Sequence, residues 1–186
     1  MVATIKWTIE QYHKMSDLGI LPANQRTELI DGEIILMAAK KPPHIIVGKL
    51  AADYLQQLFG SRAVIWRQDS IQLNDYSEPE PDITVLRPPL SSYVDRLPRA
   101  EDVIFVIEVA DATLKYDLTT KAKAYAASDI QEYWVIDAVE RHIYVHQNPH
   151  KGVYQDKNRL LESDIWRNLT FSDISIDLAR FFPPNS

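Results

Sequence analysis

The chain has 186 residues, of which 46% are hydrophobic and 25% are charged, close to the averages of globular proteins. A single domain that spans residues 1–186 is expected at this length. The absence of cysteine excludes disulfides, thiolate nucleophiles and thiolate zinc sites. Any metal must therefore be held by oxygen or imidazole, which favours Mg²⁺ or Mn²⁺ on carboxylates. The net charge of −6 argues against tight binding to nucleic acid through a broad basic face.

Composition also argues against a membrane location. No stretch reaches the roughly 18 consecutive apolar residues that a spanning helix needs, and the first residues lack the apolar segment of a signal peptide. We therefore expect a soluble, cytoplasmic protein with no membrane partner.

The first third of the sequence predicts a helix, a hairpin and a second helix. Thr8 and Gln11 form a capping-box pattern at the start of a short helix. Two apolar runs within residues 27–37 flank an Asp-Gly pair, which favours the tight turn of a β-hairpin. After two prolines, apolar residues recur at helical spacing over residues 44–59.

The remainder of the chain alternates between strands and helices. Residues 63–73 predict one or two strands, residues 87–99 predict a loop, and residues 116–128 predict a helix with Asp117 as its cap. Four further apolar segments are predicted strands: residues 83–86, 103–110, 132–137 and 141–147. The last part of the chain combines short strand-like pieces with a final apolar turn.

Glu108 interrupts an otherwise apolar predicted strand, VIFVIEVA. Ionised carboxylates are rarely buried without a partner, so this residue needs a ligand or a cation beside it. On the two-residue period of a strand it shares a face with Ile104, Val106 and Ala110. The small Ala110 leaves room for a ligand. The alternative is a structural carboxylate paired with an arginine.

Asp82 follows Pro81 and opens the predicted strand ITVL, from whose end its carboxylate can project. Taken alone, an aspartate after a proline is also typical of a turn. Together, Asp82 and Glu108 on neighbouring strands provide the hard oxygen ligands that a divalent cation prefers.

Lys121 lies on the helix predicted after the Glu108 strand. At about 3.6 residues per turn, Lys121 borders the apolar face of that helix, whereas Lys123 points to solvent. Lys121 can therefore reach the site. The alternative is a boundary lysine whose stem covers apolar surface while its charge stays in water.

Four segments resemble the Uma-two family of endonucleases, a bacterial group that was formerly a domain of unknown function. They are TELIDGEIILM, PPHIIVGKL, EPEPDITVL and VIEVADATLKYDLTTKAKAYAASDIQEYWVID. Their order and spacing make the resemblance specific, and it spans about residues 7–150. It implies the PD-(D/E)xK restriction-endonuclease-like fold of the α/β (α+β) class, in which helices flank a central mixed β-sheet.

The resemblance also implies a catalytic site. The family pattern places its first acid at Asp82, its second acid at Glu108 and its catalytic lysine at Lys121. In the usual superfamily motif the lysine stands two residues after the second acid, where this chain has Ala110. The lysine is therefore expected to have moved to the following helix.

The family resemblance also concerns three further residues. Glu28 is implied as another metal or water ligand, with a surface-strand glutamate as the alternative. His44 is implied as a contact to the substrate phosphate, with a local hydrogen-bonding role as the alternative. Asp111 lies where relatives often have a Ser-Pro-Ser stretch, and it either adds charge near the metal or caps the turn.

The implied function is that of a metal-dependent endonuclease, which uses Mg²⁺ or Mn²⁺ to hydrolyse phosphodiester bonds of DNA. Asp82, Glu108 and a main-chain carbonyl near Val109 are expected to hold the ion. The first alternative is a nuclease-fold module that binds nucleic acid or regulates without turnover. The second is a purely structural ion pair between Glu108 and Lys121. A homodimer is the expected oligomer.

Overall fold

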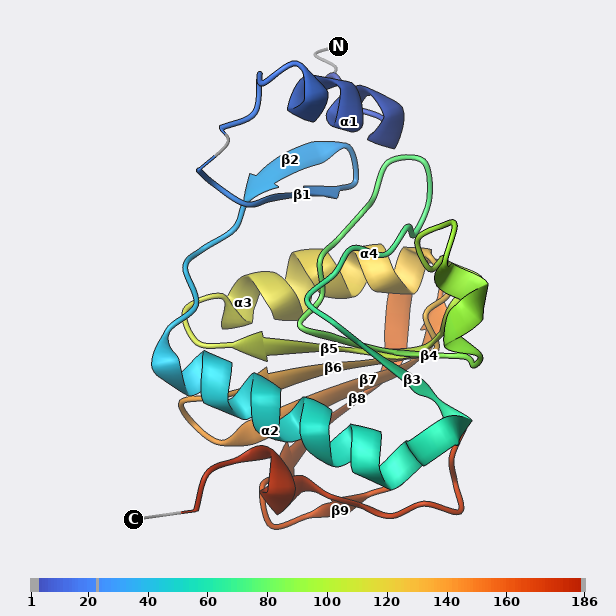
Figure 1. Cartoon of the computed structure of the whole chain (residues 1–186). Coiled ribbons are helices and arrows are strands. Elements are labelled where there is room, and N and C mark those ends of the chain that lie inside the picture. Colours follow the sequence, from blue (N-terminus) through green and yellow to red (C-terminus); the bar gives the residue numbers. More distant parts are fainter. Residues whose placement is uncertain (1–3, 23, 185–186) are drawn as a thin grey trace.

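The computed structural model of the chain describes residues 4–22 and 24–184, and its centre is a six-stranded sheet (Figure 1). The strand order is β3-β4-β5-β6-β7-β8, and neighbouring strands are antiparallel except for β5 and β6, which are parallel. The strands span Val64–Arg67 (β3), Ile83–Leu86 (β4), Val103–Ala110 (β5), Glu132–Asp137 (β6), His142–His150 (β7) and Val153–Leu161 (β8). The predicted central mixed sheet is therefore confirmed.

Helices cover both faces of this sheet (Figure 1). They are α2 (Pro42–Phe59) on one face and, on the other, a continuous segment of α3 (Leu114–Tyr116), a π-helical stretch η4 (Asp117–Lys121) and α4 (Ala122–Ala127). Alternating strand residues divide between the two layers, since Phe105 packs in the cluster of α2 whereas Val106 packs in the cluster of α4. None of the described helices is long and apolar enough to cross a membrane.

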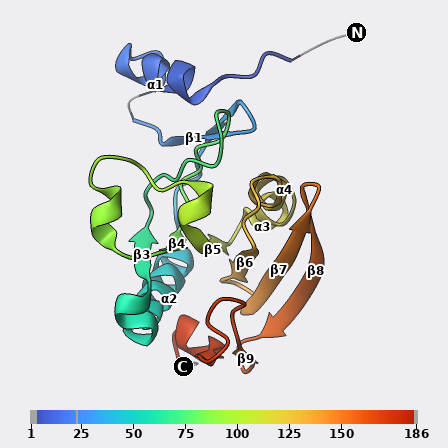
Figure 2. The same cartoon turned by 90° about the vertical axis from the view of Figure 1, so that its right-hand side faces the viewer.

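The N-terminal elements lie at the end of the molecule opposite the C-terminal segment (Figures 1 and 2). Helix α1 (Ile9–Asp17) begins with the expected capping box of Thr8 and Gln11. The hairpin pairs β1 (Thr27–Ile30) with β2 (Glu33–Leu36). Its turn residues Asp31 and Gly32 have φ of 48° and 75°, the positive values that a type I′ turn requires.

The C-terminal segment completes the apolar layer under α2. It contains β9 (Ile165–Trp166), which pairs with β10 (Ile176–Asp177), and a short 3₁₀ helix η5 (Leu178–Phe181). Phe171, Leu178 and Phe181 are buried in the same cluster as Leu55 of α2. The remaining short 3₁₀ helices are η1 (Gly60–Arg62), η2 (Leu90–Tyr93) and η3 (Ala100–Asp102).

One face assignment on the Glu108 strand is wrong. The register between β4 and β5 shifts at Val85 and Leu86, so Val85 pairs with Phe105 while Leu86 pairs with Val103. Ile104 is therefore an extra residue on β5, and it packs in the cluster of α2 rather than on the face of Glu108. A bulge of this kind interrupts the strict two-residue period on which the assignment was based.

Candidate active site

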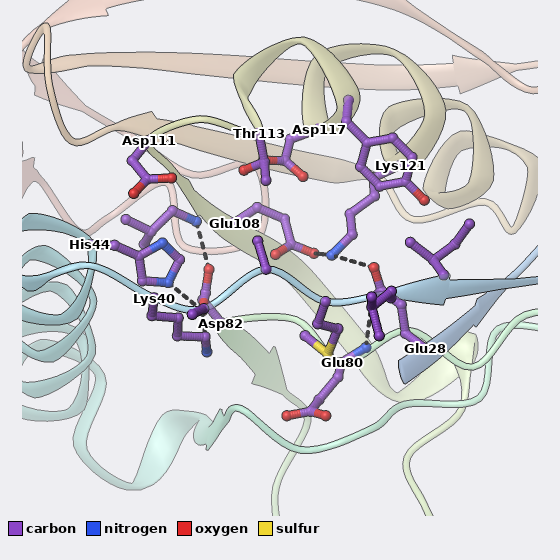
Figure 3. Close-up of a pocket in the computed structure, with 17 residues that line it drawn as sticks. Glu28, Lys40, His44, Glu80, Asp82, Glu108, Asp111, Thr113, Asp117 and Lys121 are labelled. Carbon is purple, nitrogen blue, oxygen red and sulfur yellow. Dashed lines mark hydrogen bonds and ion pairs between the residues drawn. The ribbon is translucent and has the colours of Figure 1, made fainter. Parts of the chain in front are cut away.

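A pocket of about 280 Å³ lies between the hairpin, the start of α2, the end of β5 and the α3–η4 segment (Figure 3). Its lining is rich in ionisable side chains, namely Glu28, Lys40, His44, Glu80, Asp82, Glu108, Asp111, Asp117 and Lys121. All five residues predicted for the site lie here, and they come from β1, the first turn of α2, the approach to β4, β5 and η4.

The carboxylate of Asp82 is buried but fully hydrogen bonded. Its Oδ1 accepts from Lys40 Nζ at 2.8 Å and lies 3.0 Å from His44 Nε2. Its Oδ2 accepts from the main-chain N–H of Val109 at 2.9 Å. Burial raises the pKa of Asp82, but hydrogen bonds and charge from His44 and Lys40 outweigh it and lower the pKa to about 2. This carboxylate is therefore ionised at neutral pH.

Glu108 is about equally buried, but its surroundings raise its pKa instead of lowering it. Its Oε1 accepts from Lys121 Nζ at 2.9 Å and from the Tyr125 hydroxyl at 2.7 Å. Burial raises the pKa of Glu108 to about 8, and the positive charge of Lys121 only partly opposes this effect. The cation beside Glu108 is Lys121, so the alternative of a carboxylate paired with an arginine is wrong.

Lys121 lies between two carboxyl groups (Figure 3). Its Nζ is 3.1 Å from Glu28 Oε1, in addition to the contact with Glu108, and the other oxygen of Glu28 accepts from the N–H of Glu80. Burial opposes the charge of Lys121, but the surrounding carboxyl groups more than offset this and raise its pKa. Lys121 is buried, so the alternative of a boundary lysine whose charge stays in water is wrong.

Asp117 is a site residue that the sequence reasoning missed. It was expected to cap the helix, but the helix begins earlier, at Leu114, and Asp117 starts the π-helical stretch. Its Oδ2 accepts from the Thr113 hydroxyl at 2.6 Å, and burial raises the pKa of Asp117 to about 6 against the charge of Lys121. The four-residue spacing of Asp117 and Lys121 was the available signal, since such pairs lie on one helix face.

Four more residues at this site were not predicted. Lys40 comes from the connection between β2 and α2, Tyr125 comes from α4, and the main-chain N–H of Glu80 holds Glu28. Tyr116 lines the pocket, and burial together with the negative charge of Glu28 raises its pKa to about 12.

Asp111 takes part in the turn after β5. One of its oxygens accepts from the adjacent N–H of Ala112, as expected of a turn-capping aspartate. The other oxygen is buried and has no hydrogen-bond partner among the residues that the structure describes. Because Asp111 also lines the pocket, both roles considered for it from the sequence are compatible with its position.

The donor chemistry of this pocket suits a hard divalent cation. Glu28, Glu108 and Asp117 share a single ammonium group, that of Lys121, so the buried acids outnumber the cations beside them. Oxygen ligands are those that Mg²⁺ and Mn²⁺ prefer. Within residues 4–22 and 24–184, however, no three acid or histidine side chains are arranged closely enough to hold an ion, because lysines lie between them.

Comparisons with known proteins agree with this fold. No curated protein matches the chain. A crystal structure described as that of a "putative nuclease belonging to DUF820" from Anabaena variabilis superposes with a TM-score of 0.74. It is 17% identical and the match covers 94% of this chain and 97% of that one, so the likeness concerns the fold. The family described as "Putative restriction endonuclease" (Uma2) matches residues 9–179, which extends past the expected end at residue 150, and the chain belongs to this family.

Proposed function

We propose that this protein is a metal-dependent endonuclease that hydrolyses phosphodiester bonds of DNA, with Mg²⁺ or Mn²⁺ held by Asp82 and Glu108. One observation carries this proposal: both acids face one pocket together with the ammonium group of Lys121. The excess of buried carboxyl groups supports it, because a divalent cation would balance charge that Lys121 alone does not.

When bound, the ion would lower the pKa of a water molecule and neutralise charge on the phosphate. The residues of the chain have separate tasks around it. Asp82 supplies a carboxylate that is ionised before any ion arrives, while Tyr125 and Lys121 fix the orientation of Glu108. Glu28 holds Lys121 from the other side and is a further candidate ligand.

Lys121 supplies a fixed positive charge that stabilises negative charge on the phosphate. This charge costs no reorganisation during the reaction, since two carboxyl groups already hold the ammonium group in place. His44, at the start of α2, presents an imidazole on the same side of the pocket as Asp82 and is proposed to contact the substrate phosphate (Figure 3).

The alternative is a nucleic-acid-binding or regulatory module without turnover. Ala110 favours it, because the strand lysine of the usual motif is absent, and so does the net charge of −6. The position of Lys121 Nζ, 2.9 Å from Glu108, argues for an enzyme, since the helix delivers the ammonium group that the strand lacks. A homodimer remains a prediction, which light scattering coupled to size-exclusion chromatography can test.

The decisive experiment measures cleavage of plasmid and single-stranded DNA with Mg²⁺, Mn²⁺ or EDTA. We expect ion-dependent cleavage by the parent and a loss of roughly a thousandfold or more in Glu108→Gln, Asp82→Asn and Lys121→Ala. Lys123→Ala is the matched control, because Lys123 is exposed on the same helical segment. Cleavage that persists in Glu108→Gln or Lys121→Ala would rule out this site. Ion-independent DNA binding without any cleavage would instead favour the binding module.

A further inference from the structure

The pocket of the candidate site has one side without any charged group. Five consecutive residues line it there, from the end of β2 into the connection to α2, and they form an apolar wall: Ile35, Leu36, Met37, Ala38 and Ala39. The large side chain of Leu36 is 56% exposed although it lines the pocket. Accessible apolar surface in a pocket is typical of a place where an apolar part of a ligand binds.

The apolar wall runs along the acids that are proposed to hold the ion. At one end, Ile35 on β2 pairs with Glu28 on β1. Directly after the other end comes Lys40, whose Nζ lies 2.8 Å from Asp82 Oδ1. Glu28 and Lys40 lie on opposite sides of the pocket (Figure 3). A ligand whose anionic group reaches the acids and their ion therefore has the apolar wall beside it.

A nucleotide carries both kinds of group, since its phosphate is anionic and the two faces of its base are apolar. Asp82 and Glu108 are only 6% and 4% exposed, so the phosphate must enter the pocket to reach an ion held there. In an intact duplex the faces of each base are covered by the neighbouring base pairs, and only base edges are accessible in the grooves. In an unpaired strand the base faces are free to contact protein side chains.

The charge of the chain also favours a single strand. A duplex carries about one negative charge per 1.7 Å of its axis, and proteins usually bind it through a broad basic face. This chain has a net charge of −6, and the lysines that line the pocket, Lys40 and Lys121, already contact carboxyl groups. A single strand has about half the charge of a duplex per unit length and offers base faces as a further source of affinity.

We propose that the substrate of this site is an unpaired segment of DNA, and that Leu36 contacts the face of a base next to the phosphate that is cleaved. This inference rests on the proposed function and names the form of its substrate. Contacts to a base face tolerate all four bases, because every base has such a face. The site is therefore selective for an unpaired strand rather than for a sequence.

The first experiment compares three forms of one DNA sequence with Mg²⁺: the strand alone, its fully paired duplex, and that duplex with a short unpaired loop. We expect kcat/KM for the strand and for the loop to exceed that for the paired duplex by at least about tenfold, because a paired base must first leave the stack. Equal or faster cleavage of the paired duplex would overturn the inference and leave the proposed function intact.

The substitution Leu36→Ala tests the base contact itself. Binding of a fluorescein-labelled oligothymidine is measured by anisotropy in EDTA, where an ion-dependent enzyme does not cleave. We expect the affinity to fall roughly 5- to 20-fold, because less apolar surface is buried against the base. An abasic oligonucleotide of the same length keeps the phosphates but lacks the bases, so Leu36→Ala and the parent should bind it equally. An equal loss with both oligonucleotides would overturn the contact between Leu36 and a base.

Leu161→Ala is the matched control. Leu161 ends β8 as Leu36 ends β2, it is 52% exposed, and it does not line the pocket. Its replacement should leave DNA binding unchanged, and the melting temperatures of the two alanine variants should be similar. Leu36→Phe keeps an apolar side chain and adds a ring that stacks on bases, so it should bind oligothymidine at least as well as the parent. Weak binding by Leu36→Phe together with a lower melting temperature of Leu36→Ala would assign Leu36 a structural role and overturn the inference.

The remaining outcomes separate the inference from the function on which it rests. If the parent binds oligothymidine but cleaves no form of DNA, the proposed function is wrong, and the comparison with the abasic oligonucleotide still decides the base contact. If Leu36→Ala leaves DNA binding unchanged but alters the mass measured by light scattering, the apolar wall packs against a second copy of the chain and the inference is wrong. A parent that neither binds nor cleaves DNA would refute both.

Discussion

Asp82, immediately before β4, and Glu108, on β5, are almost equally buried, with 6% and 4% of their surface exposed, yet their pKa values shift in opposite directions. Asp82 is contacted by Lys40, His44 and a main-chain N–H. Glu108 contacts the ammonium group of Lys121, which also contacts the buried Glu28. Because burial is nearly equal, the hydrogen bonds and cations beside each carboxyl group account for the opposite directions of the two pKa shifts.

This difference divides the pocket into two parts with separate chemistry. In the Asp82 part, the carboxylate is ionised and held by Lys40, His44 and a main-chain N–H. In the Glu108 part, burial raises the pKa values of the acids Glu28, Glu108 and Asp117, and the charge of Lys121 opposes this rise only in part. Acids whose surroundings separate their pKa values in this way are typical of catalytic sites.

The largest expected effect concerns the Glu108–Lys121 pair. Lys121→Met or Glu108→Leu alone leaves buried charge without its partner, so either should lower the free energy of unfolding by about 3–5 kcal/mol. The double substitution should regain most of that loss in urea denaturation, because it removes both charges. All three variants should lack cleavage. If the double variant regained stability and still cleaved DNA, the pair would be structural. The difference between Asp82 and Glu108 would then have no role in catalysis.

The pH dependence of stability tests the raised pKa of Glu108. Because the folded-state pKa of about 8 exceeds the ordinary glutamate pKa of 4.5, the contribution of Glu108 to stability is fully present below pH 4.5 and is lost as pH rises through 8. The metal-free protein should therefore lose about 2 kcal/mol between pH 6.5 and 8. Urea denaturation in EDTA measures this loss.

The control for that measurement is Glu108→Gln, whose stability should change less over the same range. His146 does not interfere, since burial lowers its pKa to about 4 and its own effect on stability lies below this range. Saturating Mn²⁺ should also flatten the profile of the parent, because a bound cation favours ionised carboxylates. A free energy of unfolding that rises with pH in EDTA would contradict the raised pKa of Glu108.

Much of the fold could be predicted because its signals are local in sequence. The capping box of Thr8 and Gln11 and the turn at Asp31-Gly32 each depend on residues within a few positions of one another. The bulge at Ile104 could not be predicted in this way. It arises from the pairing of β5 with β4, which depends on residues about twenty positions away.

The residues of the candidate site also divide into those with a local signal in the sequence and those without one. Glu108 was recognisable as an acid within an apolar strand, whereas Lys40 reaches Asp82 across 42 positions of sequence and has no local signal. Tyr125 and Tyr116 were treated as ordinary helix residues, because a constant helical period does not reveal the π-helical stretch between them. Long-range side-chain contacts and irregular backbone therefore account for what was missed.

An effect of similar size is expected at Asp82. Its folded-state pKa of about 2 lies below the ordinary aspartate pKa of 3.8, so its contribution to stability is present above pH 3.8 and is lost as pH falls through about 2. Asp82→Asn should therefore cost about 2 kcal/mol at pH 7, and the difference from the parent should narrow below pH 4. Urea denaturation at pH 7, 5 and 3.5 provides the measurement. A difference that grows on acidification would show that Asp82 is not the ionised member of the two.

The smallest effect concerns Lys40, whose side chain is 16% exposed and whose Nζ lies 2.8 Å from Asp82 Oδ1. If a cation binds at Asp82, it competes with this ammonium group for the same oxygen. Lys40→Met should therefore bind Mn²⁺ several-fold more tightly in isothermal titration calorimetry, while stability falls by about 1 kcal/mol or less. Lys41→Met, at the exposed neighbouring position, should leave Mn²⁺ affinity unchanged. Unchanged or weaker Mn²⁺ binding by Lys40→Met would show that the cation does not replace Lys40 at Asp82, and the ion would then have to bind within the Glu108 part.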